Sequence, residues 1–184
     1  MKKQPELTAL TRKKLIDAYF ELAAGGERAS VGSVAEAAGF NRCTFYRYFT
    51  DIDQLLFQVE TEICDSFEDA LRHHGSAVAS PDIIGAFADV HRKYGTYLSV
   101  LLGRYGSARF MGRMQAMMKP AASQLFKTAS DSSDAAELKV EFMLSAVLAT
   151  IMKWIDMDRP FPAEELGELI KELLLHGVFA GKAM

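Results

Sequence analysis

The sequence lacks the features that mark secreted and membrane proteins. Its only two cysteines, Cys43 and Cys64, exclude a disulfide scaffold and have no metal-type spacing. The most apolar stretch, residues 140–154, is interrupted by two charged residues and is too short to span a bilayer. Residues 1–6 are basic and then polar, with no apolar block behind them, unlike a signal peptide. We therefore expect a cytoplasmic protein without a membrane segment.

Enzyme chemistry is also missing from the sequence. The four histidines show no ligand spacing with carboxylates or cysteines. The chain has neither a glycine-rich phosphate loop nor a nucleophilic serine on an elbow motif. We expect no enzyme activity, no cofactor and no metal site.

The charge balance is compatible with a nucleic-acid partner but does not predict one. The net charge is −3 at pH 7. Through Gln54, eight lysines and arginines stand against seven acidic residues; the remainder carries thirteen against seventeen. This weak asymmetry permits DNA binding through a local N-terminal patch. With 49% apolar residues in 184, the chain can also bury a substantial core.

Apolar residues recur with the helical period throughout, and no segment alternates as a strand does. We expect an all-α fold of about nine helices, with Ser30, Asn41 and Thr50 as N-caps and Pro120 kinking or ending its helix. The expected helices are 8–24, 31–39, 42–48, 51–74, 81–93, 94–102, 107–128, 135–157 and 163–179. The predicted domains are residues 1–50, which would bind DNA, and residues 51–184, which would bind an effector and dimerise.

Residues 30–49 have the pattern of a helix-turn-helix. The first short helix carries a small residue, Ala35, where the two helices would touch. Gly39 suits a turn that needs positive φ, and Phe40 would plug the core behind it. In the second helix Phe45 and Phe49, four residues apart, form the side that would be buried.

The opposite side of that second helix has the chemistry of a DNA-reading surface. Arg42 can donate two hydrogen bonds to a guanine, and Thr44 offers a hydroxyl and a methyl group. Tyr46 and Arg47 can reach phosphate oxygens. The predicted DNA-contacting residues are Ser30, Ser33, Arg42, Cys43, Thr44, Tyr46, Arg47 and Tyr48.

The order of these residues resembles the TetR family of regulators. The resemblance spans residues 11–56 and is carried by Thr44-Phe-Tyr-Arg-Tyr-Phe49 and, before it, by Val34-Ala35 and residues 38–41. It implies that the positions of Ser30, Arg42, Cys43, Thr44, Tyr46 and Tyr48 face DNA. The chain departs from the family at Tyr48, where histidine is frequent, and at Ile52, where a lysine usually touches phosphate. Because acidic residues flank Ile52, we expect weaker non-specific DNA binding than is typical.

Other interpretations of these residues remain. Tyr46 and Tyr48 could be ordinary core aromatics. Cys43 could be a redox sensor, although we favour a small side chain that faces the groove. The weak positive charge and the absence of lysine at position 52 leave a second candidate function, a helical partner-binding co-regulator that no longer reads DNA.

Reading an operator takes two copies of the recognition helix, about 34–36 Å apart, so we expect a homodimer on a palindromic site. The last two helices are apolar enough to form a four-helix bundle with those of a second copy. The predicted interface is Phe142, Val147, Ile151, Trp154, Leu166, Ile170, Leu173 and Leu174. Alternatively, these helices close the core of the monomer and a different face pairs.

The C-terminal region is similar to that of regulators related to the dihydroxyacetone-operon activator. This likeness is carried by Tyr97-Leu98, residues 101–103, residues 151–155 and the helix start at residues 162–166. The TetR resemblance further implies a cavity that receives a small apolar or aromatic effector, oriented by a few polar groups. The predicted lining is Phe67, Phe87, His91, Tyr94, Tyr97, Leu101, Tyr105, Phe110, Met114, Met117 and Phe126. The alternative is that these residues simply pack a tight core.

Together these observations predict a DNA-binding transcriptional regulator. Such families most often repress, and we expect a small-molecule effector to release the protein from its DNA. The ligand would shift a population between two spacings of the DNA-reading heads, and the long helix from Asp51 would connect cavity and head.

Overall fold

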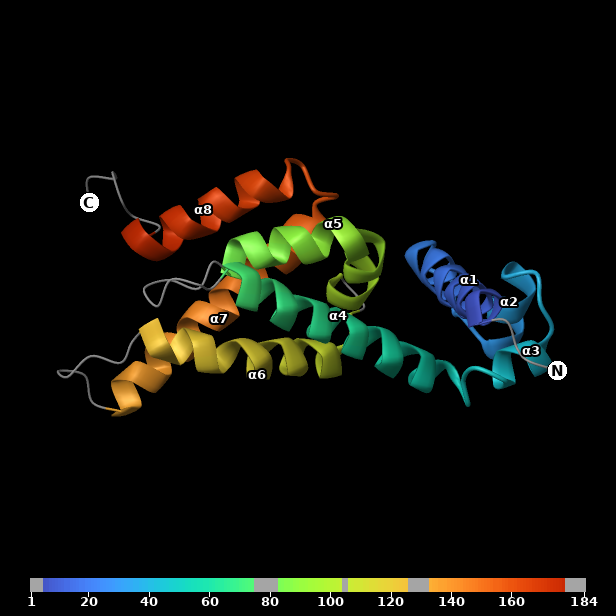
Figure 1. Ribbon diagram of the computed structural model, residues 1–184. Coiled ribbons are helices and arrows are strands. Elements are labelled where there is room, and N and C mark those ends of the chain that lie inside the picture. The colour runs from blue at the N-terminus through green and yellow to red at the C-terminus, as the bar shows by residue number, and fades with distance from the viewer. Residues whose placement is uncertain (1–4, 75–82, 104–105, 126–132, 178–184) are drawn as a thin grey trace. The chain divides into compact units, whose positions relative to one another are not determined.

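The computed structural model describes residues 5–74, 83–103, 106–125 and 133–177. Within these ranges the regular structure is entirely helical, which confirms the all-α prediction (Figure 1). The helices are α1 (Pro5–Ala24), α2 (Val31–Ala37), α3 (Arg42–Tyr46), α4 (Ile52–His74), α5 (Ile83–Leu102), α6 (Ala108–Leu125), α7 (Ser133–Asp156) and α8 (Ala163–His176). None of them is long and apolar enough to cross a membrane.

The described residues form eight helices where the sequence predicts about nine. The difference lies in α5, which continues where a break was expected between residues 93 and 94. Tyr94 has non-helical angles there (φ −123°, ψ 18°), so the two expected helices form one helix with a kink. Of the two outcomes predicted at Pro120, a kink or a helix end, the end is wrong, because α6 continues to Leu125. Proline has no amide proton, so Pro120 cannot donate to the Ala116 carbonyl four residues earlier. Both residues lie on the exposed side of α6.

The chain divides into two compact units, Met1–Ile63 and Cys64–Met184. The sequence predicts the division earlier, after residue 50. The first turns of α4 belong to the first unit because they complete its core: Leu55 and Val59 are buried, and Gln58 accepts hydrogen bonds from Arg12 of α1. The helix α4 itself is continuous across the division.

The first unit packs α1, α2 and α3 around a small apolar core with the start of α4. Its fully buried side chains include Leu15, Phe20, Val34, Phe45 and Phe49. Phe45 and Phe49, four positions apart, lie on the side of α3 that faces this core.

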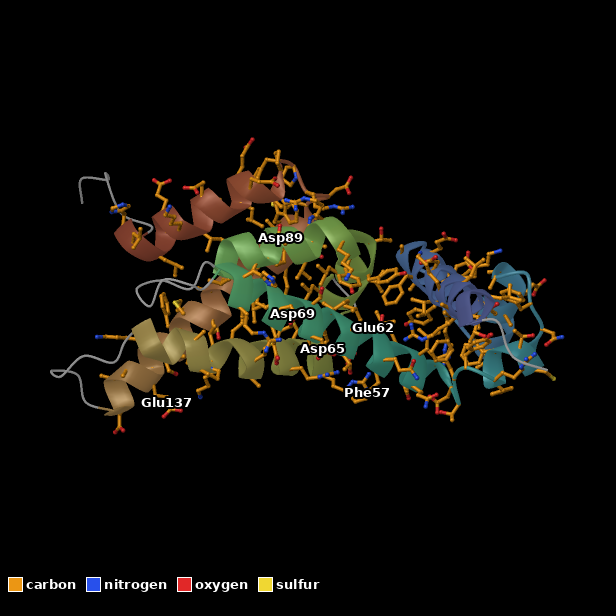
Figure 2. All side chains as sticks on the ribbon, viewed as in Figure 1. Phe57, Glu62, Asp65, Asp69, Asp89 and Glu137 are labelled. Atoms are coloured by element: carbon orange, nitrogen blue, oxygen red, sulfur yellow. The ribbon has the colours of Figure 1, made fainter. Side chains whose placement is uncertain are left out.

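Arg12 connects three parts of the first unit. Its Nη2 donates to Gln58 Oε1 at 2.9 Å and pairs with Glu62 Oε1 at 2.6 Å. Its guanidinium carbon also lies 5.7 Å from the centre of the Phe49 ring, a cation–π distance. Figure 2 labels Glu62 on α4. This arginine therefore fixes α1 against α4 and against Phe49, three residues beyond the end of α3.

The second unit packs α6 against α7, and α8 against both α5 and α7 (Figure 1). The end of α4 contributes Phe67, which is buried. The helix α7 supplies the largest share of this core. Its buried side chains are Val140, Met143, Leu144, Val147, Leu148, Ile151, Trp154 and Ile155.

Candidate nucleic-acid interface

The turn between α2 and α3 is fixed by local hydrogen bonds that the sequence predicts. Ser30 is the N-cap of α2: its Oγ accepts from the Ser33 amide at 3.2 Å, and Ser33 Oγ accepts from the Ser30 amide at 2.9 Å. Gly39 has φ +74°, and a Cβ there would meet nothing within 4 Å. The glycine is therefore required by the backbone conformation and not by lack of space.

Asn41 is the N-cap of α3, as predicted. Its Oδ1 accepts from the Thr44 amide at 2.9 Å and from the Thr44 hydroxyl at 3.1 Å. The Thr44 amide also donates to the Asn41 carbonyl oxygen at 3.0 Å, so Asn41 satisfies this amide through both its side chain and its backbone. Because the Thr44 hydroxyl donates its proton to Asn41, its oxygen keeps lone pairs that can accept from a base or from water.

The helix α3 has two different faces. Phe45 is 0% exposed and Phe49 just beyond it 1%, with ring centres 5.5 Å apart. On the other side Tyr46 is 58% exposed. All eight predicted DNA-contact residues are at least partly accessible: Ser30, Arg42, Cys43, Tyr46 and Arg47 are exposed, and Ser33, Thr44 and Tyr48 are half-buried. Tyr46 is therefore not a core aromatic, and the surface of α3 is polar and cationic.

Gly32 of α2 is a site residue that the sequence analysis missed. A Cβ built on Gly32 would lie 2.7 Å from Arg42 Nη2 and 3.1 Å from Arg42 Nε. The Arg42 guanidinium therefore rests directly on the backbone of α2. The only sequence signal was a glycine inside a helix, where it is unfavourable and often has a packing reason.

The start of α4 is acidic. Asp51 is the N-cap, where the sequence predicts Thr50, because the helix begins one residue later than expected. Asp51 Oδ1 accepts from the Gln54 amide at 2.7 Å. The neighbouring Asp53 raises the pKa of the Tyr19 hydroxyl, although burial of that phenol is the larger cause. Ile52 lies between two exposed carboxylates, so this helix start would repel a DNA phosphate.

The predicted effector pocket is present only in part. The second unit contains a cavity of about 20 Å³, room for a single water molecule. Of the predicted lining, Phe67, Phe87 and Met114 reach it. The other lining residues are Leu102, Met118, Val147, Leu148, Ile151, Leu166, Gly167 and Ile170.

The remaining predicted pocket residues lie elsewhere. Leu101 and Phe110 are buried in the core without lining the cavity. Met117, His91, Tyr94 and Tyr97 are half-buried. Tyr105 and Phe126 lie outside the described residues. The expected set therefore does not form one chamber, since the core packs closely around most of it.

Most of the predicted dimer residues are buried inside the second unit instead. Val147, Ile151, Trp154, Leu166 and Ile170 are at most 8% exposed, and four of them line the cavity. The prediction is corrected for these five: α7 is apolar around most of its girth because it is the central helix of its own unit.

A different side of α7 stays apolar and exposed. Phe142 is 74% exposed and Leu138, one turn earlier, 71%. Ser145 and Ala149 continue the same exposed stripe at helical spacing. On α8, Leu174 is 42% exposed and Leu173 is half-buried. Of the predicted interface, Phe142, Leu173 and Leu174 therefore remain accessible to a partner.

In the part of the chain that the structure describes, no group of three His, Cys, Asp or Glu side chains could hold a metal ion. Both cysteines are free; Cys43 is exposed and Cys64 is buried.

Part of the first unit matches a known protein family. Residues 15–59 match the family described as "Bacterial regulatory proteins, tetR family". No curated protein matches the chain. Among solved structures the chain is similar to the fatty acid degradation regulator FadR from Bacillus halodurans. The identity is 18% and the TM-score 0.69, over 97% of this chain and 98% of that one.

A second similar structure is Thermus thermophilus FadR, a TetR-family transcriptional repressor solved in complex with lauroyl-CoA. Here the identity is 16% and the TM-score 0.49, over 94% of this chain and 97% of that one. The likeness to the Bacillus halodurans protein supports the fold, an N-terminal helix-turn-helix followed by a helical unit. The family match covers the helix-turn-helix with its two-faced α3. Residues 15–59, with the helix-turn-helix of the first unit, therefore resemble the DNA-binding segment of TetR-family regulators.

Proposed function

We propose that this regulator represses transcription as a homodimer on a palindromic operator and that a small-molecule effector releases it. The observation that carries the proposal is the division of α3 into a buried side, with Phe45 and Phe49, and an accessible polar side. A helix with this division can enter a major groove without unfolding its own domain.

Each accessible side chain has a role in this proposal. Arg42 reads a guanine through its two-pronged guanidinium. Thr44 and Tyr46 contact base edges or the sugar-phosphate backbone, and Arg47 and Tyr48 contact phosphate. Cys43 is small enough to let the helix approach the groove. At the start of α2, the Ser30 hydroxyl accepts from the Ser33 amide and can donate its own proton to a phosphate, with Ser33 beside it.

The second copy is placed on the exposed stripe of α7. A stripe of Leu138, Phe142, Ser145 and Ala149 combines two large apolar residues with two small ones, which lets helices approach closely. Exposed apolar side chains of this size commonly mark a protein–protein interface. Leu173 and Leu174 of α8 add apolar area. The partner is a second copy of the chain, because the operator requires two reading heads.

The effector is placed in the apolar core of the second unit. The cavity of about 20 Å³ is far smaller than the roughly 300–1,000 Å³ of typical ligand pockets, so binding must open the core. Met114 and Met118 line it and can adapt to a ligand. Phe67 carries the change along α4, which continues without a break into the first unit.

Likeness to the dihydroxyacetone-operon activator subgroup stays a prediction, as does a location in the cytoplasm.

The test is binding to the DNA upstream of the protein's own gene, measured by fluorescence polarisation over a salt series. Affinity should fall steeply with salt, since phosphate contacts release counterions. Arg42→Ala and Tyr46→Ala should each lose operator binding and remain dimeric by sedimentation. Lys171→Ala, an exposed cation of the second unit, is the matched control and should bind normally. Affinity that does not respond to salt would favour a partner-binding co-regulator instead.

A further inference from the structure

His91 on α5 has a buried ring nitrogen without a partner. Its Nε2 is shielded from solvent and makes no hydrogen bond in the structure. The ring is held in place by two aromatic neighbours, since its centre lies 5.1 Å from the Trp154 ring and 5.8 Å from the Phe87 ring. Buried polar atoms nearly always have a partner, so an oriented and unpaired imidazole nitrogen suggests a ligand.

A cation is brought to the same place by a strained connector between α7 and α8. Asp158 and Arg159 are both left-handed, with φ of 58° and 53°, which is unusual for residues other than glycine. The Asp158 amide donates to Ile155 O and the Arg159 amide to Trp154 O, each at 3.0 Å, which closes the end of α7. Trp154 Nε1 donates to Phe161 O at 3.0 Å and holds the far side of the connector. Strain of this kind concentrates at functional sites.

The two groups converge over Gly95. A Cβ built on Gly95 would lie 3.5 Å from His91 Nε2 and 3.8 Å from Arg159 Nη1. Because glycine has no side chain, no methyl group stands between the imidazole and the guanidinium at this point. No ion pair in the described residues involves Arg159. The next cation along α5, Arg92, is already paired with Asp89, labelled in Figure 2.

This place adjoins the apolar cavity. Phe87, one helical turn before His91 on α5, lines the cavity, and so does Ile151, one turn before Trp154 on α7. A ligand with its polar end over Gly95 can therefore continue along Phe87 into the core. Amphipathic anions have this shape, with a charged head and an apolar tail.

We propose that His91 and Arg159 bind the anionic head group of an amphipathic effector above Gly95, with its apolar tail in the opened core. The inference rests on the proposed effector function and names the chemical class of the ligand. A carboxylate and a phosphate share the required chemistry, since both accept charge-assisted hydrogen bonds from imidazolium and guanidinium.

The electrostatics around His91 agree with this role. Burial, and next the positive charge of Arg159, lower the pKa of His91, and Glu164 on α8 opposes them in part. Glu164 lies 3.7 Å from Arg92. A bound anion would reverse the balance and raise the pKa of His91, so binding should take up a proton and strengthen as the pH falls.

The experiment uses Trp154, the single tryptophan of the chain, as a fluorescent reporter beside His91. Decanoate, decyl phosphate and 1-decanol, which share a tail and differ in the head, are titrated into the full-length dimer. Both anions or one of them should bind at least tenfold more tightly than the alcohol. Tighter binding of decanoate indicates a fatty-acid type of effector, and tighter binding of decyl phosphate a phosphorylated one.

Three variants and one control make the result specific. Arg159→Gln and His91→Gln should each weaken anion binding about tenfold or more and leave 1-decanol binding unchanged. Gly95→Ala should do the same, because its methyl group would contact both His91 Nε2 and Arg159 Nη1 and crowd an anion held between them; at 3.5 and 3.8 Å these are ordinary contacts, so the fold is kept. Lys153→Gln, an exposed cation in the last turn of α7, is the control and should behave as wild type.

Equal affinities for decanol and both anions would overturn the proposal. So would unchanged anion binding in the folded Gly95→Ala variant, or no binding of any of the three probes. The effector function is measured separately by operator binding with each probe. If an anion binds through His91 and Arg159 without changing operator affinity, the anion site stands and the release mechanism fails.

Discussion

Replacing Gly32 with alanine should separate the stability of the helix-turn-helix from its DNA reading. The new Cβ would lie 2.7 Å from Arg42 Nη2, whereas ordinary contacts begin near 3.4 Å. The guanidinium must therefore move by roughly 0.7 Å. Side chains that read a site must be held within about 0.5 Å of the productive geometry. Since a two-pronged arginine–guanine contact contributes about 1–3 kcal/mol, we expect operator affinity to fall roughly tenfold.

Stability should change in the opposite direction. Gly32 lies in the first turn of α2, where alanine is favoured over glycine by up to about 1 kcal/mol. The clash is with the end of a flexible side chain, which can move at little energetic cost. Urea unfolding should therefore give an unchanged or slightly higher free energy of unfolding for Gly32→Ala. Loss of affinity without loss of stability would assign the effect to the position of Arg42.

A double-mutant cycle tests this reasoning. Arg42→Ala alone should weaken operator binding by tenfold or more, and adding Gly32→Ala should weaken it no further, because the displaced group is gone. Polarisation titrations at one fixed salt concentration give all four affinities. If Gly32→Ala weakens binding equally with and without Arg42, the glycine acts through something else, and the resting place assigned to Arg42 is wrong.

Three further predictions concern other parts of the molecule. Arg12→Ala should lower the free energy of unfolding by about 1–2 kcal/mol in urea. Arg12→Lys should restore little of it, because lysine lacks the planar guanidinium that bonds Gln58 through two nitrogens and lies over the Phe49 ring; full rescue by lysine would contradict this. Phe142→Asp should give monomers by sedimentation, whereas Leu10→Asp, an exposed leucine on α1 of the first unit, should remain dimeric; a dimer that survives Phe142→Asp would rule out the α7 stripe as the interface. The folded state lowers the pKa of His91 below its usual 6.5, so the unfolded chain binds a proton more readily as the pH falls below about 6.5. The melting temperature of wild type should therefore fall relative to that of His91→Gln in this range. Parallel curves for the two proteins between pH 7.5 and 5 would argue against a buried neutral imidazole.

Local features of the first unit were predictable because they depend on neighbours in the sequence. An N-cap side chain accepts a hydrogen bond from the amide three residues later in the chain. This local rule identifies Ser30 and Asn41 as caps, and the structure confirms both. The spacing of Phe45 and Phe49 likewise gives the buried side of α3. Thr50 was wrong by one residue, since Thr50 and Asp51 are equally good caps and only the start of α4 selects between them. The contact of Arg42 with Gly32 crosses between helices, and no sequence period reports it.

The second unit was harder to predict, because periodicity shows which residues are apolar and not what covers them. Val147 and Ile151 are as apolar as Phe142, yet the first two face the cavity and the third faces outward. A helix that is apolar nearly all round is consistent with a dimer interface and with a central core helix. Only the packing of α5, α6 and α8 on α7 decides between them. The same packing leaves Leu138, which the prediction omitted, beside Phe142 on the exposed stripe.

The small cavity determines how an effector can act on this protein. A space of about 20 Å³ cannot admit a ligand tail, so the ligand-bound core must differ from the present one. The ligand can shift the population only by the difference in its affinity for the two states, and the present state offers the tail almost nothing. The helix α5 is suited to open, because it is kinked at Tyr94 and carries both Phe87 at the cavity and His91 at the proposed anion site. The head group could therefore bind before the core opens, and the tail would then hold α5 in its new position. On this reasoning, a short anion such as acetate should occupy the site over Gly95 without changing operator affinity, and only longer tails should release DNA.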